Sequence, residues 1–256
     1  MTDNQKKTVG LLGLGSFGQL MARHLLPHFT LQAYDPASEA KTFADAHGIA
    51  MLPPDQVAKA DVVIIGAPVP RMEEAIASIK DHLSEGTLVL DVGSVKVKPA
   101  ALMLRDLPSH VDLIATHPLF GPQSGKNGIE GQKIVLCPLR CPQERVEKLK
   151  GFLETALALK VIMATPDEHD REAAVVFGLT HLVSKMLVQD FEPFPIGMTT
   201  KSYELLIESV NMVRFCSPEL FLAIECENPY VHDVSQTFFA KADALRQYLE
   251  ENREKA

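Results

Sequence analysis

The sequence predicts an α/β protein, with a doubly wound parallel sheet in its N-terminal part and an all-helical region after it. Three observations lead to this fold class. Short apolar runs alternate with amphipathic segments up to Thr165, the strand-like runs stop there, and a glycine-rich turn joins the first run to the first helix. We therefore expect one domain over residues 1–165 and a helical second domain over residues 166–256.

The expected strands are short and apolar on both faces, as strands buried between two helical layers should be. They are Thr8–Gly13, Leu31–Asp35, Asp61–Gly66, Thr87–Val92, Asp112–Thr116, Lys133–Cys137 and Val161–Ala164. The helices expected between them are Ser16–Leu26, a segment ending at Ala46, Arg71–Leu83, Pro99–Leu107 and Gln143–Leu159. This alternation implies parallel strands joined by right-handed crossovers.

The C-terminal region carries helical periodicity that prolines interrupt. The helices expected there are Asp167–Asp190, Thr200–Phe215, Pro218–Glu227 and Val231–Glu251. The segment Phe191–Met198 contains two prolines and should be an irregular connector. Several of these helices have a nonpolar face, and four or so helices bury only part of that surface among themselves. We therefore expect a homodimer through the C-terminal helices, with each active site between a protomer's own two domains.

Composition excludes several classes of partner. The chain has 256 residues, 46% hydrophobic content, a formal net charge of -8 and a pI of about 5.6. Such an acidic chain has no surface-wide positive field for nucleic acid or anionic lipid. Only Met1–Lys7 precede the first apolar run, and no apolar stretch has membrane-spanning length, so we expect a cytoplasmic protein. The four cysteines lack metal-binding spacing, and we expect reduced thiols at Cys137, Cys141, Cys216 and Cys226.

The segment Gly13–Gly18 has the spacing G-x-G-x-x-G between the first strand and the first helix, as in Rossmann dinucleotide-binding turns. Gly13 permits the tight turn, Gly15 lets backbone amides approach a pyrophosphate, and Gly18 lets helix and strand pack closely. Asp35 ends the second strand 22 positions after Gly13, where a carboxylate accepts hydrogen bonds from the adenosine ribose. The expected cofactor-binding residues are Gly13, Gly15, Ser16, Phe17, Gly18, Asp35, Ala67, Pro68 and Gly93.

NAD is the expected cofactor, and NADP is less favoured. The carboxylate of Asp35 would repel the 2′-phosphate of NADP, and no arginine follows closely to hold that phosphate. The alternative is that the glycines serve only a tight turn and that Asp35 caps the next helix. Ala67, Pro68 and Gly93 follow later strands at their carboxyl ends, so they should line the nicotinamide.

His117 follows the fifth predicted strand, in a loop rich in glycine and proline. An enzyme that oxidises an alcohol needs a base for the hydroxyl proton, and histidine suits that role near neutral pH. His117 is therefore the candidate general base. The alternative is a loop histidine that is hydrogen-bonded only to backbone.

Four segments carry a family resemblance. They are THPLFGPQSGKNG (116–128), DVGSVK (91–96), EHDREAA (168–174) and THLVSKML (180–187). Together they resemble the prephenate and arogenate dehydrogenases of tyrosine biosynthesis, especially the compact forms similar to the plant enzymes. The resemblance runs from Val9 to about Asn228; it is specific at HP-x-x-GP and GSVK and looser after Pro193.

The resemblance implies oxidative decarboxylation of a cyclohexadienol, in which NAD takes a hydride and loss of the carboxylate makes the ring aromatic. His117 would accept the proton of the ring hydroxyl, and Ser94 would hydrogen-bond and orient that hydroxyl. Ser94 could also cap the following helix, and the two roles can coexist. The implied substrate-binding residues are Ser94, His117, Gln123, Lys126, Asp170, His181 and Lys201.

The substrate of such enzymes has two carboxylates, so an acidic protein must gather cations locally. The candidates are Lys96, Lys126, Arg171, Lys201 and Arg214. Lys126 and Lys201 are the two that we favour. The sequence departs from many bacterial members at Ser184, where they have a second histidine, and at Met212, where they have a substrate-binding arginine. His181 matches the first histidine of that helix; its alternative is simple packing at the domain boundary.

Asp170 is the acid of the E-H-D segment, which plant-like members associate with arogenate, because a carboxylate attracts the ammonium group of that substrate. We therefore lean to arogenate over prephenate, although Asp170 could equally cap its helix. Two other readings stay open: a dehydrogenase of the β-hydroxyacid type with the same two domains, and a nucleotide sensor without chemistry. The combination of His117 with Ser94 favours the enzyme, because a sensor needs neither residue.

Overall fold

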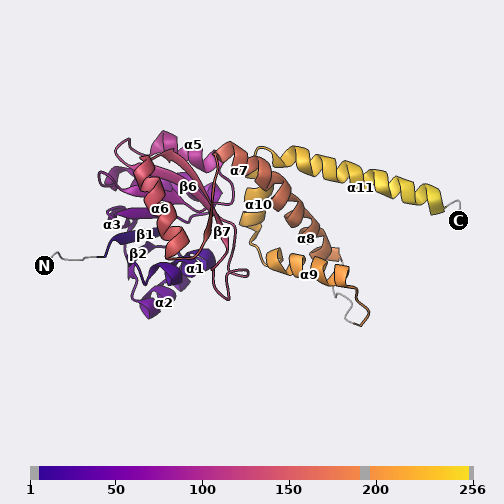
Figure 1. Ribbon diagram of the computed structural model, residues 1–256, viewed down its shortest axis with the longest axis horizontal. Helices are drawn as coiled ribbons and strands as arrows, with labels where there is room; N and C mark the ends of the chain where they lie inside the picture. Colours follow the sequence, from indigo (N-terminus) through magenta and orange to yellow (C-terminus); the bar gives the residue numbers. More distant parts are fainter. Residues whose placement is uncertain (1–5, 191–196, 254–256) are drawn as a thin grey trace. The chain divides into compact units, whose positions relative to one another are not determined.

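The computed structural model describes residues 6–190 and 197–253. The chain divides into two compact units, unit 1 (Met1–Asp167) and unit 2 (Glu168–Ala256) (Figure 1). The sequence suggests a division after Thr165, and the structure has it after Asp167. No helix in the described ranges is long and apolar enough to cross a lipid bilayer.

Unit 1 is built on one eight-stranded sheet. Its strands are β1 (Thr8–Leu12), β2 (Thr30–Tyr34), β3 (Ala50–Met51), β4 (Val62–Ile65), β5 (Leu88–Asp91), β6 (Asp112–Pro118), β7 (Lys133–Arg140) and β8 (Lys160–Met163). Their order across the sheet is β3-β2-β1-β4-β5-β6-β7-β8, so the chain winds outward from β1 in both directions. All seven predicted strands are present within three residues of their expected bounds, and the two-residue β3 is an addition.

β7 runs antiparallel to β6, which corrects the expectation of a fully parallel sheet. The loop of residues 119–132 joins these two strands without a helix, so the chain reverses directly at that point. β8 then pairs in parallel with β7, because the helix α6 (Gln143–Thr155) provides a crossover. The other neighbouring strands are paired in parallel, as the alternation of elements predicts.

The helices of unit 1 lie between the strands in the chain. They are α1 (Ser16–Leu25), α2 (Ser38–His47), α3 (Pro54–Val57), α4 (Met72–Ile79), α5 (Val97–Asp106) and α6, with short 3-10 turns η1 (Val69–Arg71) and η2 (Lys80–His82) on either side of α4. The single helix predicted over Arg71–Leu83 is therefore α4 with two tighter ends. α6 stops at Thr155 rather than Leu159, and Ala158 then takes a positive φ of 52°. The four-residue α3 is too short for periodicity to reveal.

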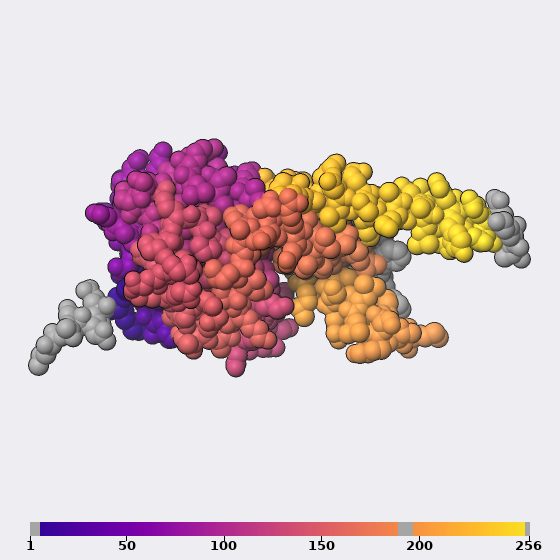
Figure 2. All heavy atoms as spheres, turned by 45° about the horizontal axis from the view of Figure 1, so that its top comes forward, coloured from indigo at the N-terminus to yellow at the C-terminus, as the bar shows by residue number. Residues whose placement is uncertain are grey.

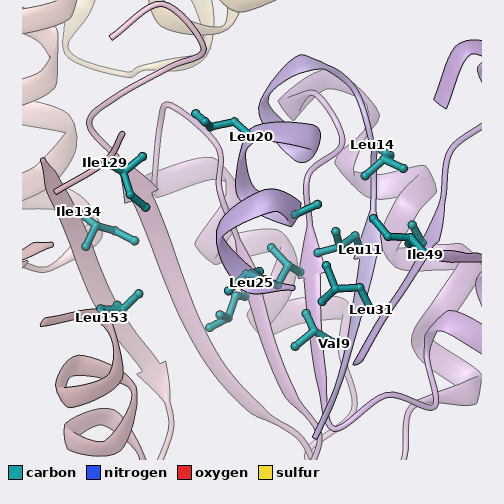
Figure 3. Close-up of a cluster of buried hydrophobic side chains, with 14 of the residues drawn as sticks. Val9, Leu11, Leu14, Leu20, Leu25, Leu31, Ile49, Ile129, Ile134 and Leu153 are labelled. Atoms are coloured by element: carbon teal, nitrogen blue, oxygen red, sulfur yellow. The ribbon is translucent and has the colours of Figure 1, made fainter. Parts of the chain in front are cut away.

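Helices cover both faces of the sheet. One core contains Leu25 of α1 and Leu153 of α6, and Figure 3 shows these side chains with Val9 of β1. The other core contains Ile76 of α4 and Met103 of α5. Because side chains alternate along a strand, successive sheet residues enter different cores, and the strands are apolar on both faces as predicted.

The secondary-structure elements of unit 2 are all helices in its described residues. Its elements are α7 (Pro166–Ala173, which begins in unit 1), a π-helical turn η3 (Ala174–Gly178), α8 (Leu179–Asp190), α9 (Lys201–Val213), α10 (Pro218–Glu227) and α11 (Val231–Arg253). The helix expected over Asp167–Asp190 is thus interrupted by the π turn. Residues 191–196 of the expected connector Phe191–Met198 lie outside the described residues.

Two packing details define this unit. A Cβ atom at Gly178 would lie 2.6 Å from a methyl group of Val231, so the π turn and the start of α11 pack in close contact. From Phe239 to Arg253, α11 is exposed, and Figure 2 shows its end extending beyond the other helices of the unit. Large apolar side chains on this exposed part include Leu245 and Leu249.

Candidate functional site

The candidate site lies at the carboxyl edge of the parallel strands of unit 1. The register places Leu12 of β1 beside Ile65 of β4, and Ile65 beside Asp91 of β5. The turns that follow these strands therefore start at one edge of the sheet, where β6 also ends. Ligands of doubly wound sheets bind outside this edge.

The glycine-rich turn after β1 contains two glycines that the fold requires and one, Gly15, that it does not. Gly13 has a φ of +113°, and a Cβ atom there would lie 2.8 Å from the carbonyl oxygen of Gly66. A Cβ atom at Gly18 would collide with the carbonyl group of Gly13. Gly15 has an ordinary φ of -67°, and a Cβ atom there would have nothing within 4 Å. Packing explains Gly13 and Gly18, whereas Gly15 leaves room for a ligand.

The N-terminus of α1 is suited to an anion. Gly15 is its N-cap and supplies no side chain, and the first turn holds no acidic residue. The first backbone N–H groups of a helix have no partner within the helix, and its dipole is positive at that end. Ser16 and Phe17 begin this helix, so a pyrophosphate near Gly15 would meet their amide groups.

Asp35 holds the glycine-rich turn through two hydrogen bonds to backbone amides. One of its carboxylate oxygens accepts a hydrogen bond from the Leu14 amide at 2.6 Å, and the other accepts one from the Ala37 amide at 2.8 Å. Asp35 does not cap α2, because Ala37 is the N-cap of that helix. A carboxylate oxygen can accept more than one hydrogen bond, so these contacts leave capacity for ribose hydroxyls.

His117 lies inside β6 rather than in the loop after it, which corrects the sequence-based placement. It pairs with Val135 of β7, and 7% of its surface is exposed. Ser94 lies in the turn between β5 and α5, and its buried hydroxyl oxygen has no hydrogen-bond partner among the described residues. The capping role of Ser94 is wrong, because Lys96 is the N-cap of α5 and no side chain caps that helix.

A buried ion pair joins the turn that contains Ser94 to the strand that contains His117. Lys96 has no exposed surface and pairs with Asp91 at the end of β5. Its ammonium group also donates to the carbonyl oxygen of Thr116 at 2.6 Å. Lys96 is thus engaged inside the protein, which removes it from the candidates for a substrate carboxylate.

The sequence reasoning missed this pair, although a signal was present. Asp91 ends a strand that is otherwise fully apolar, and a charged residue there needs a buried partner. Sequence reasoning does not point to Lys96 as that partner, because lysine is rarely buried completely.

The loop of residues 119–132 packs against α1. The rings of Phe120 and Phe17 lie 6.1 Å apart, and a Cβ atom at Gly125 would lie 2.9 Å from a methyl group of Leu20. Gln123 and Lys126, both expected to bind substrate, are exposed in this loop. The loop therefore connects the nucleotide turn to the end of β6.

In unit 2, Asp170 belongs to a buried polar cluster. Its carboxylate lies 2.7 Å from Nδ1 of His169, and both side chains are almost fully buried. Its backbone carbonyl accepts a hydrogen bond from the side-chain amide of Asn228 at 2.8 Å. Asp170 is the fifth residue of α7, so it does not cap that helix. Neither His169 nor Asn228 was singled out from the sequence.

His181 lies just after the π turn. Its Nδ1 atom is 2.9 Å from the carbonyl oxygen of Phe177, while Nε2 is buried with no partner in the described ranges. Burial lowers the pKa of this imidazole, and the bond to Phe177 opposes that effect. A neutral ring that donates from Nδ1 presents a hydrogen-bond acceptor at Nε2.

The favoured cation of unit 2, Lys201, is exposed at the start of α9 and lies 3.5 Å from Glu204. Met212, which stands at the position of the family arginine, is 56% exposed. Arg214 lies with its guanidinium over the ring of Phe215. Lys201, Met212 and Arg214 all belong to unit 2.

An apolar hollow of about 120 Å³ lies within unit 1 and is not the candidate site. Its wall is made of apolar side chains apart from His24 and Thr116. A substrate with two carboxylates would lose its hydration there without gaining partners. The pKa of His24 is lowered by burial and by the neighbouring Arg23, which disfavours a cationic wall.

The fold and the site define a class: a Rossmann-type nucleotide-binding domain followed by a helical domain. The family model for the prephenate dehydrogenase nucleotide-binding domain matches residues 20–163. The family model for the prephenate dehydrogenase dimerization domain matches residues 165–256. The chain belongs to the prephenate dehydrogenase family, as the resemblance of its motifs implies.

Relatives and solved structures agree with this membership. Arogenate dehydrogenase 2, chloroplastic, of Arabidopsis thaliana is 31% identical over 86% of this chain. A probable arogenate/prephenate dehydrogenase of Methanocaldococcus jannaschii is 28% identical over 75% of the chain. The chain spans 64% and 44% of the lengths of these two relatives. The structure of prephenate dehydrogenase from A. aeolicus with hydroxyphenyl propionate and NAD+ has the same fold, with a TM-score of 0.77, 21% identity and coverage of 99% of this chain and 94% of that one.

Proposed function

We propose that this chain is an NAD-dependent dehydrogenase that oxidatively decarboxylates arogenate or prephenate, giving tyrosine or 4-hydroxyphenylpyruvate. The observation that carries the proposal is the buried hydroxyl oxygen of Ser94, which lacks a hydrogen-bond partner in the described residues. Ser94 follows β5, and β5 lies next to β6, the strand of His117. Buried hydroxyls are normally hydrogen-bonded, so an orphan at the ligand-binding edge supports a ligand that completes it. Family membership supports the same reaction.

NAD is the proposed cofactor, and the residues present fit it. The open space at Gly15 and the uncapped N-terminus of α1 suit a pyrophosphate, and Asp35 suits the ribose hydroxyls. When bound, NAD supplies the hydride acceptor. The related A. aeolicus enzyme, whose structure contains NAD+, is consistent with this choice.

His117 is the proposed general base. It takes the proton of the ring hydroxyl as hydride leaves the carbon that bears it. The bond to the ring carboxylate then breaks, carbon dioxide departs, and its electron pair enters the ring. His117 returns the proton to the ring oxygen, so the product is a phenol and aromaticity drives the step.

Ser94 is the proposed orienting group. Its hydroxyl oxygen can both donate and accept, so it can hold the ring hydroxyl in one direction while His117 removes the proton. A β-hydroxyacid dehydrogenase would not need this pair, and the family models over both halves of the chain favour the prephenate dehydrogenases instead.

The two ends of the substrate require charged or polar partners. Lys126 and Lys201 are exposed cations and are proposed to bind the carboxylates, with Gln123 and His181 as further contacts. The lean to arogenate rests on similarity to the plant enzymes, because Asp170 already holds His169 in a buried pair. We therefore propose both substrates, with arogenate first.

A homodimer is the proposed assembly, and residues 165–256 match a dimerization domain. One face of α11 supports it, because the half-buried Phe238 and the exposed Ala242, Leu245 and Leu249 recur at spacings of four, three and four residues. Leu245 is 58% exposed and Leu249 is 47% exposed in the single chain. A second copy would cover this face. We also propose a cytoplasmic location, which suits the four free cysteines.

The test is steady-state kinetics with arogenate and prephenate, each with NAD and NADP, followed by NADH absorbance and product analysis. The proposal expects turnover of at least one substrate with NAD, with release of carbon dioxide. Purified protein that binds NAD but turns over neither substrate would refute it.

A further inference from the structure

We infer that Asp91 and Lys96 form a positioning pair that sets Ser94 and His117 relative to one another. This inference rests on the proposed function, because it concerns the two side chains that we place in the reaction. Both side chains of the pair are buried, so the pair needs no contact with substrate or cofactor. It acts through the backbone on both sides of the site.

One oxygen of the Asp91 carboxylate holds the turn that contains Ser94. This oxygen, Oδ2, accepts from the amide of Gly93 at 2.9 Å and from the ammonium group of Lys96. Gly93 and Lys96 flank Ser94 in the chain, so the turn is fastened on both sides of the serine. A Cβ atom at Gly93 would lie 3.1 Å from this same oxygen, which shows how closely the turn wraps the carboxylate.

The other oxygen and the lysine hold the strand that contains His117. Oδ1 of Asp91 accepts from the amide of Thr116 at 3.0 Å, and Lys96 donates to the carbonyl oxygen of Thr116 at 2.6 Å. That carbonyl belongs to the peptide bond between Thr116 and His117. The orientation of His117 at the end of β6 therefore depends on the same ion pair that fixes the turn containing Ser94.

Burial keeps the side chains of Asp91 and Lys96 in fixed positions. Lys96 is fully buried and Asp91 is 1% exposed, so neither side chain can leave without loss of a buried partner. Buried ion pairs often stabilise a protein no better than apolar residues of similar size. The main effect of such a pair is to fix the positions of the groups bonded to it. A misplacement of about 1 Å at a reacting group can lower turnover roughly 100-fold.

The experiment compares Lys96→Met with the double variant Asp91→Asn/Lys96→Met and with Lys148→Met as a matched control. Lys148 makes an exposed ion pair with Glu144, so its replacement removes a lysine without touching the site. Each protein is assayed for kcat and KM with arogenate, prephenate and NAD. Binding of ADP-ribose, which probes the glycine-rich turn without the nicotinamide, is measured by calorimetry.

The double variant removes both charges of the pair, so we expect it to fold, with the Kd for ADP-ribose and the KM for substrate within threefold of the wild type. We expect its kcat to fall roughly 100-fold, because no group then holds the Thr116 carbonyl. Lys148→Met should match the wild type throughout. A folded double variant with kcat within threefold of the wild type would overturn the inference, and so would a double variant that cannot fold.

Failure of the proposed function is distinguishable from failure of this inference. If the wild type turns over neither substrate, the function fails and the pair is tested by NMR instead. The ring signals of His117, assigned with His117→Asn, should then move in the double variant and stay in place in Lys148→Met. Unchanged His117 signals in the folded double variant would overturn the positioning role by itself.

Discussion

Gly15→Ala should separate nucleotide binding from folding, with Gly13→Ala as its matched counterpart. Both changes add one methyl group to the same turn. At Gly15 the backbone has a φ of -67° and the new carbon meets nothing within 4 Å. At Gly13 it would meet the Gly66 carbonyl oxygen at 2.8 Å, with a φ of +113°. The two variants add the same group, but only the methyl group at Gly13 collides with the protein's own backbone.

The expected magnitudes follow from these geometries. At Gly15, lower chain entropy in the unfolded state stabilises by about 0.4–1 kcal/mol, and alanine is a poorer N-cap than glycine by a similar amount. Stability should thus stay within about 0.5 kcal/mol. At Gly13, strain and overpacking together cost about 2–6 kcal/mol. For a unit of this size, that lowers Tm by roughly 4 °C or more.

Gly15→Ala should weaken nucleotide binding although it leaves stability nearly unchanged. A methyl group at Gly15 moves the pyrophosphate away from the N-terminus of α1, and loss of one charge-assisted hydrogen bond costs about 1.5–3 kcal/mol. The Kd for NADH should rise roughly 10- to 150-fold. Thermal unfolding without nucleotide and fluorescence titration with NADH measure the two effects. Wild-type affinity in Gly15→Ala, or a Tm as low as that of Gly13→Ala, would refute the reasoning.

Four further predictions follow from the site and from unit 2. His117→Asn should lower turnover by about two to four orders of magnitude while NADH titration remains near normal, and near-normal turnover would remove His117 from the mechanism. The double variant Asp35→Ser/Pro36→Arg should raise the ratio of kcat/KM with NADP to kcat/KM with NAD at least tenfold, as kinetics with both cofactors would measure. Asp35→Asn is the control, because its side-chain oxygen can still accept the hydrogen bond from the Leu14 amide. Light scattering at micromolar concentration should give about twice 28.1 kDa, and Leu245→Asp should give a single chain while Gln247→Asp, on the other side of α11, does not; a wild-type monomer contradicts this. Burial raises the pKa of Glu225 to about 7, so the folded form binds its proton more tightly than the unfolded form, and stability should fall as pH rises from about 4.5 through 7; Glu225→Gln should raise Tm at pH 8 but not at pH 5, and equal effects at both would argue against it.

Much of unit 1 could be predicted because its signals are local. The strands are apolar on both faces, glycine spacing locates the turn after β1, and His117 follows a buried run; none of these needs knowledge of distant residues. The apolar run of β7 does not itself reveal the reversal, because such a run looks the same in either direction; the absence of an expected helix before it is the signal. The connection between β6 and β7 decided it, since that loop contains no crossover helix.

The candidate site shows the same division. The sequence by itself singled out the nucleotide turn, Asp35, Ser94 and His117 as candidates, because each lies at or just after the end of a readable apolar run. Only the tertiary structure decided that Lys96 is a buried partner of Asp91 and that Asp35 holds the amide of Leu14. The contact from Lys96 to Thr116 spans 20 residues of chain. Periodicity reports which face of an element is buried, but a polar side chain acquires its partner only when separate strands are brought side by side.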